Sequence, residues 1–254
     1  MNTLLYDGSF DGLLTAIFEV FEYRFHDVNI VKRENFQQEN MFAEVHEVIT
    51  QNERAERVLK KIEKNLGKQG ITELLRVYLS EDAALERLIL EAVRLSIQFP
   101  SQNILNNFAN EDILKISKLV RSVGRESHRM NAFVRFEMLE DGFYFSKILP
   151  DFNVLPLIKN HFKERYKDQK WMIYDERRNY GIIYDLNDVD FFYPTQEQTQ
   201  SLLHSHSILH EAEIPYQKLW QKYFIKTNIV ERKNDKLHRQ HIPKRYWKYL
   251  TEKS

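Results

Sequence analysis

The start of the chain combines a short apolar run with a helical apolar pattern. Residues 3–7 are mostly apolar and end on the turn signal Asp7-Gly8-Ser9, after which apolar residues recur at helical spacing over 13–21. This order predicts a strand, a tight turn and a helix. Gly8 and Gly12 lie where backbone N–H groups can approach a phosphate. A phosphate loop and a plain turn both fit, and the lack of a GxGxxG pattern favours the plain turn.

Helical periodicity then extends from about residue 52 to about residue 125. Apolar side chains recur every three or four positions, as in Val58, Ile62 and Leu66. Asn110 is a candidate N-cap for a helix that begins near Glu111. The short connections predict antiparallel helices, and the lack of a fixed-period repeat argues against a solenoid.

After residue 131 the apolar pattern changes to a period of two. Apolar residues alternate over 132–138, a turn signal follows at 140–142, and an apolar run returns over 143–149, which predicts a hairpin. We expect a helix over about 154–166 and a second hairpin built from 171–174 and 180–184. Residues 189–209 form a polar connection, and a final helix is predicted over about 216–229.

These elements predict an α+β protein with three regions in one continuous globule. Residues 1–125 are expected to be mainly helical, 126–190 to form an antiparallel sheet with a helix (hairpin, helix, hairpin), and 191–254 to form a connection, a basic helix and a tail. With 254 residues, 43% of them hydrophobic, seven Gly and six Pro, the chain is long and apolar enough to bury a sizeable core.

The composition excludes several classes of site. The sequence contains no cysteine, so disulfides, thiolate zinc sites, iron–sulfur clusters and cysteine nucleophiles are ruled out, and we expect no cofactor in this chain. There is no apolar run of about 20 residues and no signal-peptide pattern at the N-terminus. We therefore expect a cytoplasmic protein without membrane contact.

Charge is unevenly distributed, although the formal net charge is zero. Residues 216–254 hold eleven Lys or Arg against three acids, and aromatic residues lie among them. Cations mixed with flat apolar rings suit a phosphate backbone with bases stacked beside it. The candidate nucleic-acid-binding residues here are Lys218, Lys222, Lys226, Arg232, Arg239, Lys244, Arg245, Tyr246 and Trp247. An ordinary solvated helix surface is the alternative for the lysines, and core packing is the alternative for Trp247.

A second basic cluster lies between residues 115 and 135, with six Lys or Arg against one acid. Its candidate nucleic-acid-binding residues are Lys118, Arg121, Arg125 and Arg135. Arg121, Arg125 and Arg129 would share one helix face if the helix continues through Gly124.

Polar side chains gather directly before the predicted hairpin and are candidates for catalysis. His128 has the chemistry of a general acid or base near neutral pH, and Arg129 and Asn131 lie beside it in the sequence. A capping or core histidine is the alternative for His128. Tyr184 and His161 are further candidates for such a pocket.

Three histidines near residue 207 invite a comparison with metal sites. His206 and His210 have the i, i+4 spacing of ligands on one helix face, and His204 precedes them. A general-base Glu does not follow the first histidine, so we expect no metal here. The chain also lacks the Gly-x-Ser-x-Gly elbow of serine hydrolases.

Several segments together resemble a known family. They are Tyr6-Asp7-Gly8-Ser9-Phe10-Asp11-Gly12, His128-Arg129-Met130, Phe133-Val134-Arg135-Phe136, Pro150-Asp151-Phe152-Asn153, Trp171-Met172-Ile173-Tyr174-Asp175, Arg178-Asn179-Tyr180-Gly181, and 243–252, which reads PKRYWKYLTE. The chain is similar over nearly its whole length to an uncharacterised bacterial family described as DNA-metabolism or DNA-repair proteins. The resemblance implies a companion role beside a radical S-adenosylmethionine protein, or fusion to a uracil-DNA glycosylase-like domain.

Three functions follow as hypotheses. The first is a DNA-binding protein that uses the two basic clusters and presents DNA to such a partner enzyme, which would itself hold the cluster chemistry that a cysteine-free chain lacks. The second is an enzyme that acts on damaged or modified nucleotides through His128, Arg129 and Asn131. The third is a protein-interaction module without nucleic-acid contact, in which the aromatic and basic tail docks on the partner.

Overall fold

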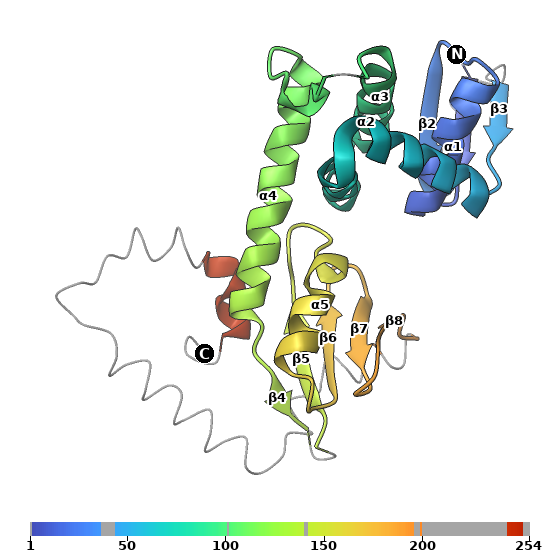
Figure 1. The fold of residues 1–254 in the computed structure, drawn as a ribbon. Helices are drawn as coiled ribbons and strands as arrows, with labels where there is room; N and C mark the ends of the chain where they lie inside the picture. The colour runs from blue at the N-terminus through green and yellow to red at the C-terminus, as the bar shows by residue number, and fades with distance from the viewer. Residues whose placement is uncertain are drawn as a thin grey trace. The chain divides into compact units, whose positions relative to one another are not determined.

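The chain folds into two compact units, residues 1–124 and 125–254, in the computed structural model (Figure 1). The structure describes residues 2–36, 44–100, 102–139, 142–195, 199 and 243–250. Both units combine helices with strands, which confirms the predicted α+β class.

The first unit opens with the predicted strand, turn and helix. Its elements are β1 (Asn2–Tyr6), α1 (Phe10–Glu22), β2 (Val28–Lys32), η1 (Arg33–Asn35), β3 (Glu44–Glu47), α2 (Asn52–Leu79), α3 (Leu85–Gln98), η2 (Ile104–Asn106) and the first part of α4 (Glu111–Phe133). Ser9 caps α1 by accepting a hydrogen bond from the N–H of Gly12. Asn110 accepts from the N–H groups of Asp112 and Ile113, as expected for the N-cap of α4.

Within this mainly helical unit the structure adds a three-stranded parallel sheet in the order β2-β1-β3, of which the sequence predicted only the first strand. The sequence predicted the central strand β1 from its short apolar run, and four of its five residues are buried. Ile30 is the one fully buried residue of β2, and β3 has the mostly polar sequence Glu-Val-His-Glu. These edge strands therefore lack the apolar run that marks a buried parallel strand.

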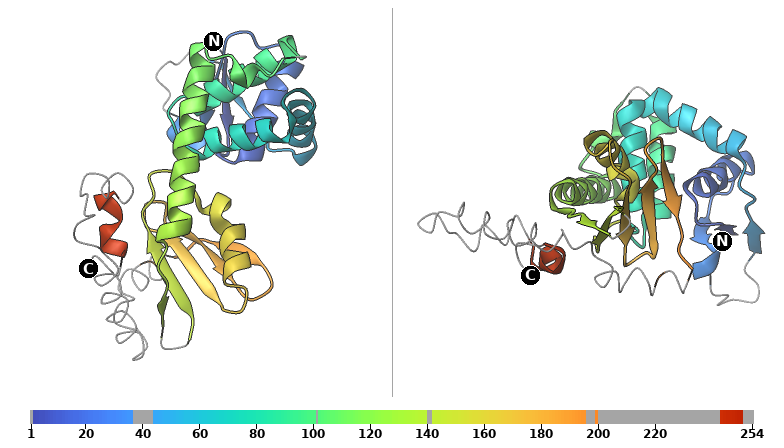
Figure 2. Two further views of the ribbon diagram at one scale, coloured as in Figure 1. Left: turned by 60° about the vertical axis from the view of Figure 1, so that its left-hand side comes forward. Right: turned by 90° about the horizontal axis from the view of Figure 1, so that it is seen from below.

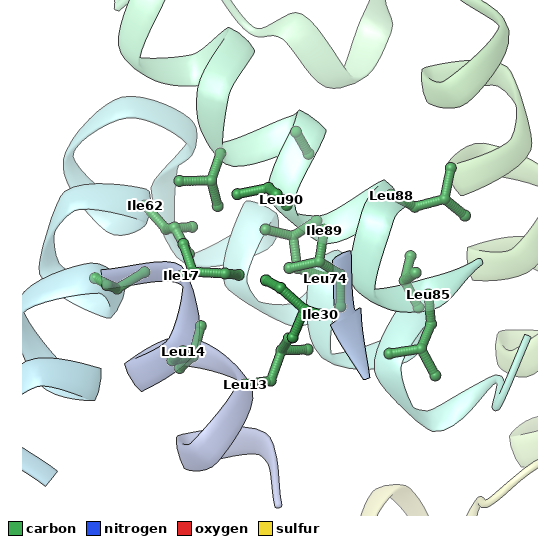
Figure 3. Close-up of a cluster of buried hydrophobic side chains, with 14 of the residues drawn as sticks. Leu13, Leu14, Ile17, Ile30, Ile62, Leu74, Leu85, Leu88, Ile89 and Leu90 are labelled. Carbon is green, nitrogen blue, oxygen red and sulfur yellow. The ribbon is translucent and has the colours of Figure 1, made fainter. Parts of the chain in front are cut away.

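The core of the first unit joins its helices to the sheet. Figure 3 shows Leu13, Leu14 and Ile17 of α1 in one cluster with Ile62 and Leu74 of α2 and with residues of α3. The long helix α2 bends at Gly67, whose φ of 71° an L-residue with a side chain rarely adopts.

The second unit is built around a five-stranded sheet in the order β4-β5-β6-β7-β8. Its elements are the end of α4, β4 (Glu137–Met138), β5 (Tyr144–Ile148), α5 (Leu155–Arg165), β6 (Trp171–Asp175), β7 (Tyr180–Tyr184), β8 (Val189–Phe192) and η5 (Lys244–Tyr249). The β6-β7 hairpin and the helix α5 confirm the prediction.

The sheet is mixed, which corrects the expected antiparallel arrangement of hairpin, helix and hairpin. β5 pairs parallel to β6, while the other three pairs are antiparallel. A helix between two neighbouring strands returns the chain to the end where the first strand began, so α5 makes β5 and β6 parallel. β8 adds a strand inside the segment expected to be a polar connection.

Helix α4 continues through Gly124 to Phe133, so the hairpin expected from residue 132 is reduced to the two residues of β4. Glu126, Met130 and Val134 follow one another at helical spacing, and all three are buried. Burial of this stripe favours helix over the alternating strand pattern.

One face of the second sheet carries the core of the unit. Trp171, Ile173 and Ile182 pack there with Ile158 and Phe162 of α5, which Figure 2 shows beside the strands. In the ranges with described coordinates, none of the helices combines the length and the hydropathy needed to cross a membrane.

Candidate nucleic-acid interface

Helix α4 has one exposed basic face. Lys118, Arg121, Arg125 and His128 follow at spacings of three and four residues, and all four are exposed. Arg129, which the sequence placed on the face of Arg121 and Arg125, turns instead toward Glu126, and their charged groups are 3.7 Å apart. Arg135 bends back at the end of the helix and donates to the carbonyl of Ala132.

The buried carboxylate of Glu126 organises the polar centre of the second unit. Glu126 is 1% exposed and accepts hydrogen bonds from the backbone N–H of Asp151, the guanidinium of Arg245 and the hydroxyl of Tyr246. A buried charge is stable only when hydrogen bonds and opposite charges surround it. Glu126 therefore holds η5 (Lys244–Tyr249) against α4, with Arg245 and Tyr246 at the point of contact.

A second buried carboxylate lies at the end of β6. Asp175 accepts from the backbone N–H groups of Arg177 and Arg178 and pairs with the Arg178 guanidinium at 2.9 Å. Burial raises the pKa of Asp175, and Arg178 opposes that shift. Arg178 also donates to the carbonyls of Pro150 and Asp151, so it locks the loop after β5 onto the end of β6.

The cations of η5 are more exposed than its aromatic rings. Lys244, Arg245 and Lys248 are exposed, while Tyr246 is buried and donates to Glu126. Tyr249 anchors the segment in the same way through Glu176. Tyr246, predicted as a nucleic-acid-binding ring, is therefore an anchor whose ring does not face solvent, and Trp247 is half-buried.

The exposed cations of η5 lie over rings of the same segment. Lys244 is 6.0 Å from the centre of the Trp247 ring, and Lys248 is 4.4 Å from that of Tyr249. Arg245 and Lys248 also pair with carboxylates, at 2.8 Å to Asp151 and 3.1 Å to Glu176. Lys244 forms no ion pair with a residue that the structure describes, so its positive charge is not neutralised by a described carboxylate.

The three candidate catalytic residues face different surroundings. His128 is exposed, Arg129 turns toward Glu126, and the Asn131 side-chain oxygen is buried without a hydrogen-bond partner within the described ranges. Of the further candidates, Tyr184 donates to the carbonyl of Leu186, and His161 packs edge-on against Phe162. These contacts are typical of structural residues.

Several predicted residues lie outside the described residues. They are the nucleic-acid candidates Lys218, Lys222, Lys226, Arg232 and Arg239, and the histidines His204, His206 and His210. The final helix predicted over about 216–229 lies there as well.

A row of aromatic side chains on β7, on β8 and directly after β8 escaped the sequence-based search. The Tyr193 ring stacks on Tyr180 at 5.7 Å with an interplanar angle of 18°, and the Phe191 ring lies 6.2 Å from the same Tyr180 ring at 35°. Tyr193 is 75% exposed and Phe191 is 40% exposed. Lys159 of α5 places its ammonium group 5.3 Å from the centre of the Phe191 ring. Three consecutive aromatic residues at 191–193 were the signal, hidden inside a segment predicted to be a polar connection.

The loop Pro150–Asn153 connects this aromatic row to η5. Asp151 pairs with Arg245, and two residues later Asn153 accepts the hydroxyl of Tyr180. The loop follows the parallel strand β5, and ligands in sheets with parallel strands often bind at that end. This part of the second unit therefore offers rings for stacking and cations for phosphates beside one loop.

In the N-terminal turn, which was considered as a phosphate loop, donors that could bind a phosphate bond the carboxylate of Asp7 instead. Asp7 accepts from the N–H and hydroxyl of Ser9 and from the hydroxyl of Thr50. Burial opposes ionisation of Asp7, but these hydrogen bonds outweigh it and lower its pKa. The contacts favour the plain turn.

A family model described as a domain of unknown function, DUF4130, matches residues 83–252. No curated protein matches the chain significantly.

Proposed function

The chain belongs to the DUF4130 family, and because that family's description names no activity, we propose a function from the geometry of the structure. We propose that the chain binds single-stranded nucleic acid through the second unit. The observation that carries the proposal is the aromatic row Phe191, Tyr180 and Tyr193, with Lys159 at one end. We also propose, from the family resemblance, that the bound strand is DNA and that it is held for a partner repair enzyme of the radical S-adenosylmethionine or uracil-DNA glycosylase-like kind.

Exposed rings on a sheet suit unpaired bases. Tyr193 already stacks one face on Tyr180, and its 75% exposure leaves room for a base on the opposite face. Stacking of one base on an aromatic side chain contributes about 1–3 kcal/mol and tolerates any base. The bases of a duplex are already stacked on one another, so the row favours single strands.

The cations supply the attraction to phosphates. Lys159 lies beside Phe191, and η5 exposes Lys244, Arg245 and Lys248. Arg125 of the same unit is exposed on α4. Binding to these groups releases counterions, so the logarithm of the affinity should fall by about 0.7 per neutralised phosphate for each tenfold increase in salt.

Fluorescence anisotropy with a labelled single-stranded oligonucleotide tests the stacking. We expect the double variant Phe191→Ala/Tyr193→Ala to bind about tenfold more weakly or worse, because two stacking rings are lost. Phe108→Ala is the matched control, since Phe108 is a 47% exposed ring in the first unit. Equal affinity of the double variant and the unaltered protein, or no binding of either at low salt, would overturn the proposal.

The charge contribution is tested separately. Lys244→Ala should lower the salt dependence by about one phosphate contact and leave stacking intact. Lys60→Ala is the control, because the Lys60 side chain is 75% exposed in the first unit. A partner that co-purifies with the chain after nuclease treatment, together with no oligonucleotide binding, would favour the protein-interaction hypothesis instead.

A further inference from the structure

A small cavity in the first unit lies where α1 ends. It measures about 330 Å³ and is lined by Val20, Phe21, Arg24, Phe25, His26 and Arg94. The lining combines three apolar side chains with two arginines and a histidine, and it includes no carboxylate. Its volume is at the lower end of the range for small-molecule sites.

Arg24 has a backbone conformation that favours glycine. It follows the last turn of α1 with a φ of 55°, and the N–H of Phe25 bonds back to the carbonyl of Val20. This is the geometry of a helix that ends on a left-handed residue, a position usually held by Gly. A long cationic side chain at a position where it strains the backbone indicates a role for that side chain.

Arg94 brings a second guanidinium to the cavity from α3. It donates to the backbone carbonyl of His26 at 3.4 Å, which ties α3 to the segment after α1. Among the described residues, neither Arg24 nor Arg94 forms an ion pair, whereas Arg54 and Arg87 of the same unit each pair with a carboxylate at 2.7 Å. Two guanidinium groups beside one cavity without a described carboxylate partner suit an anion.

We propose that this cavity binds a phosphate monoester carried on a planar apolar group, as in a nucleoside monophosphate. The two arginines would hold the phosphate, and Val20, Phe21 and Phe25 would contact the planar group. The last carbonyls of α1 oppose an anion, but those of Glu19 and Val20 already accept N–H groups of Tyr23 and Phe25. The inference concerns the first unit alone and does not depend on the function proposed for the second.

Isothermal titration of the full chain with AMP, adenosine and inorganic phosphate tests the ligand class. We expect AMP to bind at least tenfold more tightly than either adenosine or phosphate, because both parts of the cavity are then filled. Phosphate that binds as tightly as AMP would overturn the planar part of the proposal, and no AMP binding at millimolar concentration would overturn all of it.

Arg24→Gly is the decisive variant because it should stabilise the folded protein, so a loss of binding could not be caused by unfolding. It relieves the left-handed strain, so the midpoint of urea unfolding should rise while AMP binding weakens at least tenfold. Arg94→Gln should weaken AMP binding similarly. The control Arg33→Gln removes an exposed guanidinium elsewhere in the unit and should leave AMP binding unchanged. Unchanged binding by Arg24→Gly would contradict the site.

Competition with oligonucleotides distinguishes a free nucleotide from the 5′-phosphate end of a nucleic acid as the ligand. The Phe191→Ala/Tyr193→Ala protein, with the aromatic row of the second unit removed, is loaded with AMP. Displacement of AMP by a 5′-phosphorylated strand, but not by a 5′-hydroxyl strand, would identify the end of a nucleic acid as the ligand. Displacement by neither would identify a free nucleotide.

Discussion

Tyr246 donates the hydrogen of its hydroxyl to Glu126, a residue 120 positions earlier in the chain. Both side chains are buried, and Arg245 adds its guanidinium to the same carboxylate at 3.0 Å. This contact fastens the basic segment η5 to α4. The cations proposed to bind phosphates therefore project from a segment that is held in place.

Removal of that hydroxyl should destabilise the second unit. Tyr246→Phe leaves one oxygen of the buried Glu126 carboxylate short of a donor, at a cost of about 1–3 kcal/mol in the free energy of unfolding. Urea denaturation followed by circular dichroism measures it. Tyr193→Phe is the control, because Tyr193 is 75% exposed and its loss of a hydroxyl should change the unfolding free energy little. Equal effects of the two variants would contradict the anchoring role of Tyr246.

Lysine should not replace arginine at position 178. Arg178 bonds Asp175 and the carbonyl of Pro150 through Nη1 and the carbonyl of Asp151 through Nη2, and its side chain is 9% exposed. A single ammonium group cannot reproduce this geometry, so Arg178→Lys should cost about 2 kcal/mol or more of unfolding free energy. Arg165→Lys, at the end of α5, is the control. An unchanged urea midpoint for Arg178→Lys would show that the loop after β5 does not need the two donor nitrogens of the guanidinium.

Two glycine-to-alanine changes, one at Gly181 in β7 and one at Gly124 in α4, should have opposite effects. A Cβ at Gly181 would lie 2.1 Å from the Phe192 ring and 2.6 Å from the Ile173 carbonyl, so Gly181→Ala should destabilise by about 1–3 kcal/mol. A Cβ at Gly124 would come no closer than 3.6 Å to the nearest atom, and Ala is favoured in a helix by about 0.5–1 kcal/mol. Thermal unfolding of both variants decides the matter, and stabilisation by Gly181→Ala would refute the close packing of Phe192.

Acid should remove the stabilisation that Asp7 provides. The folded-state pKa of Asp7 is lowered by the hydrogen bonds of Ser9 and Thr50, although burial opposes this. A lowered acid pKa gives stability above the unfolded value of about 3.9 that disappears as the pH falls through the folded value. The difference in unfolding free energy between the unaltered protein and Asp7→Asn should therefore shrink below about pH 4. Thr50→Val should reproduce part of this profile, and a difference independent of pH would count against the prediction.

The sequence predicted those elements whose apolar pattern matches their burial. β1, α1, α5 and the β6-β7 pair have regular apolar positions and formed as expected. β2 and β3 are edge strands with few buried side chains, so they carry no such signal. The direction of β5 relative to β6 is a property of the connection through α5 rather than of any single strand.

The candidate site was predicted only in part. The sequence grouped Lys244, Arg245 and Tyr246 as nucleic-acid-binding candidates. It could not show that Tyr246 points inward to Glu126, because that contact joins residues 120 positions apart. Arg129 was expected on the same helix face as Arg121 and Arg125, and its guanidinium turns toward Glu126. The stacked pair Tyr180 and Tyr193 requires two strands in register, which composition does not reveal.

The stretch shared with the family begins at residue 83, inside the first unit. Leu88, Ile89 and Ala92 of α3 are completely covered, and they belong to one cluster with residues of β1, α1 and α2 that precede the shared stretch. A recombinant fragment that contains only residues 83–252 would expose these apolar side chains to water and should aggregate. Laboratory expression should therefore begin upstream of β1.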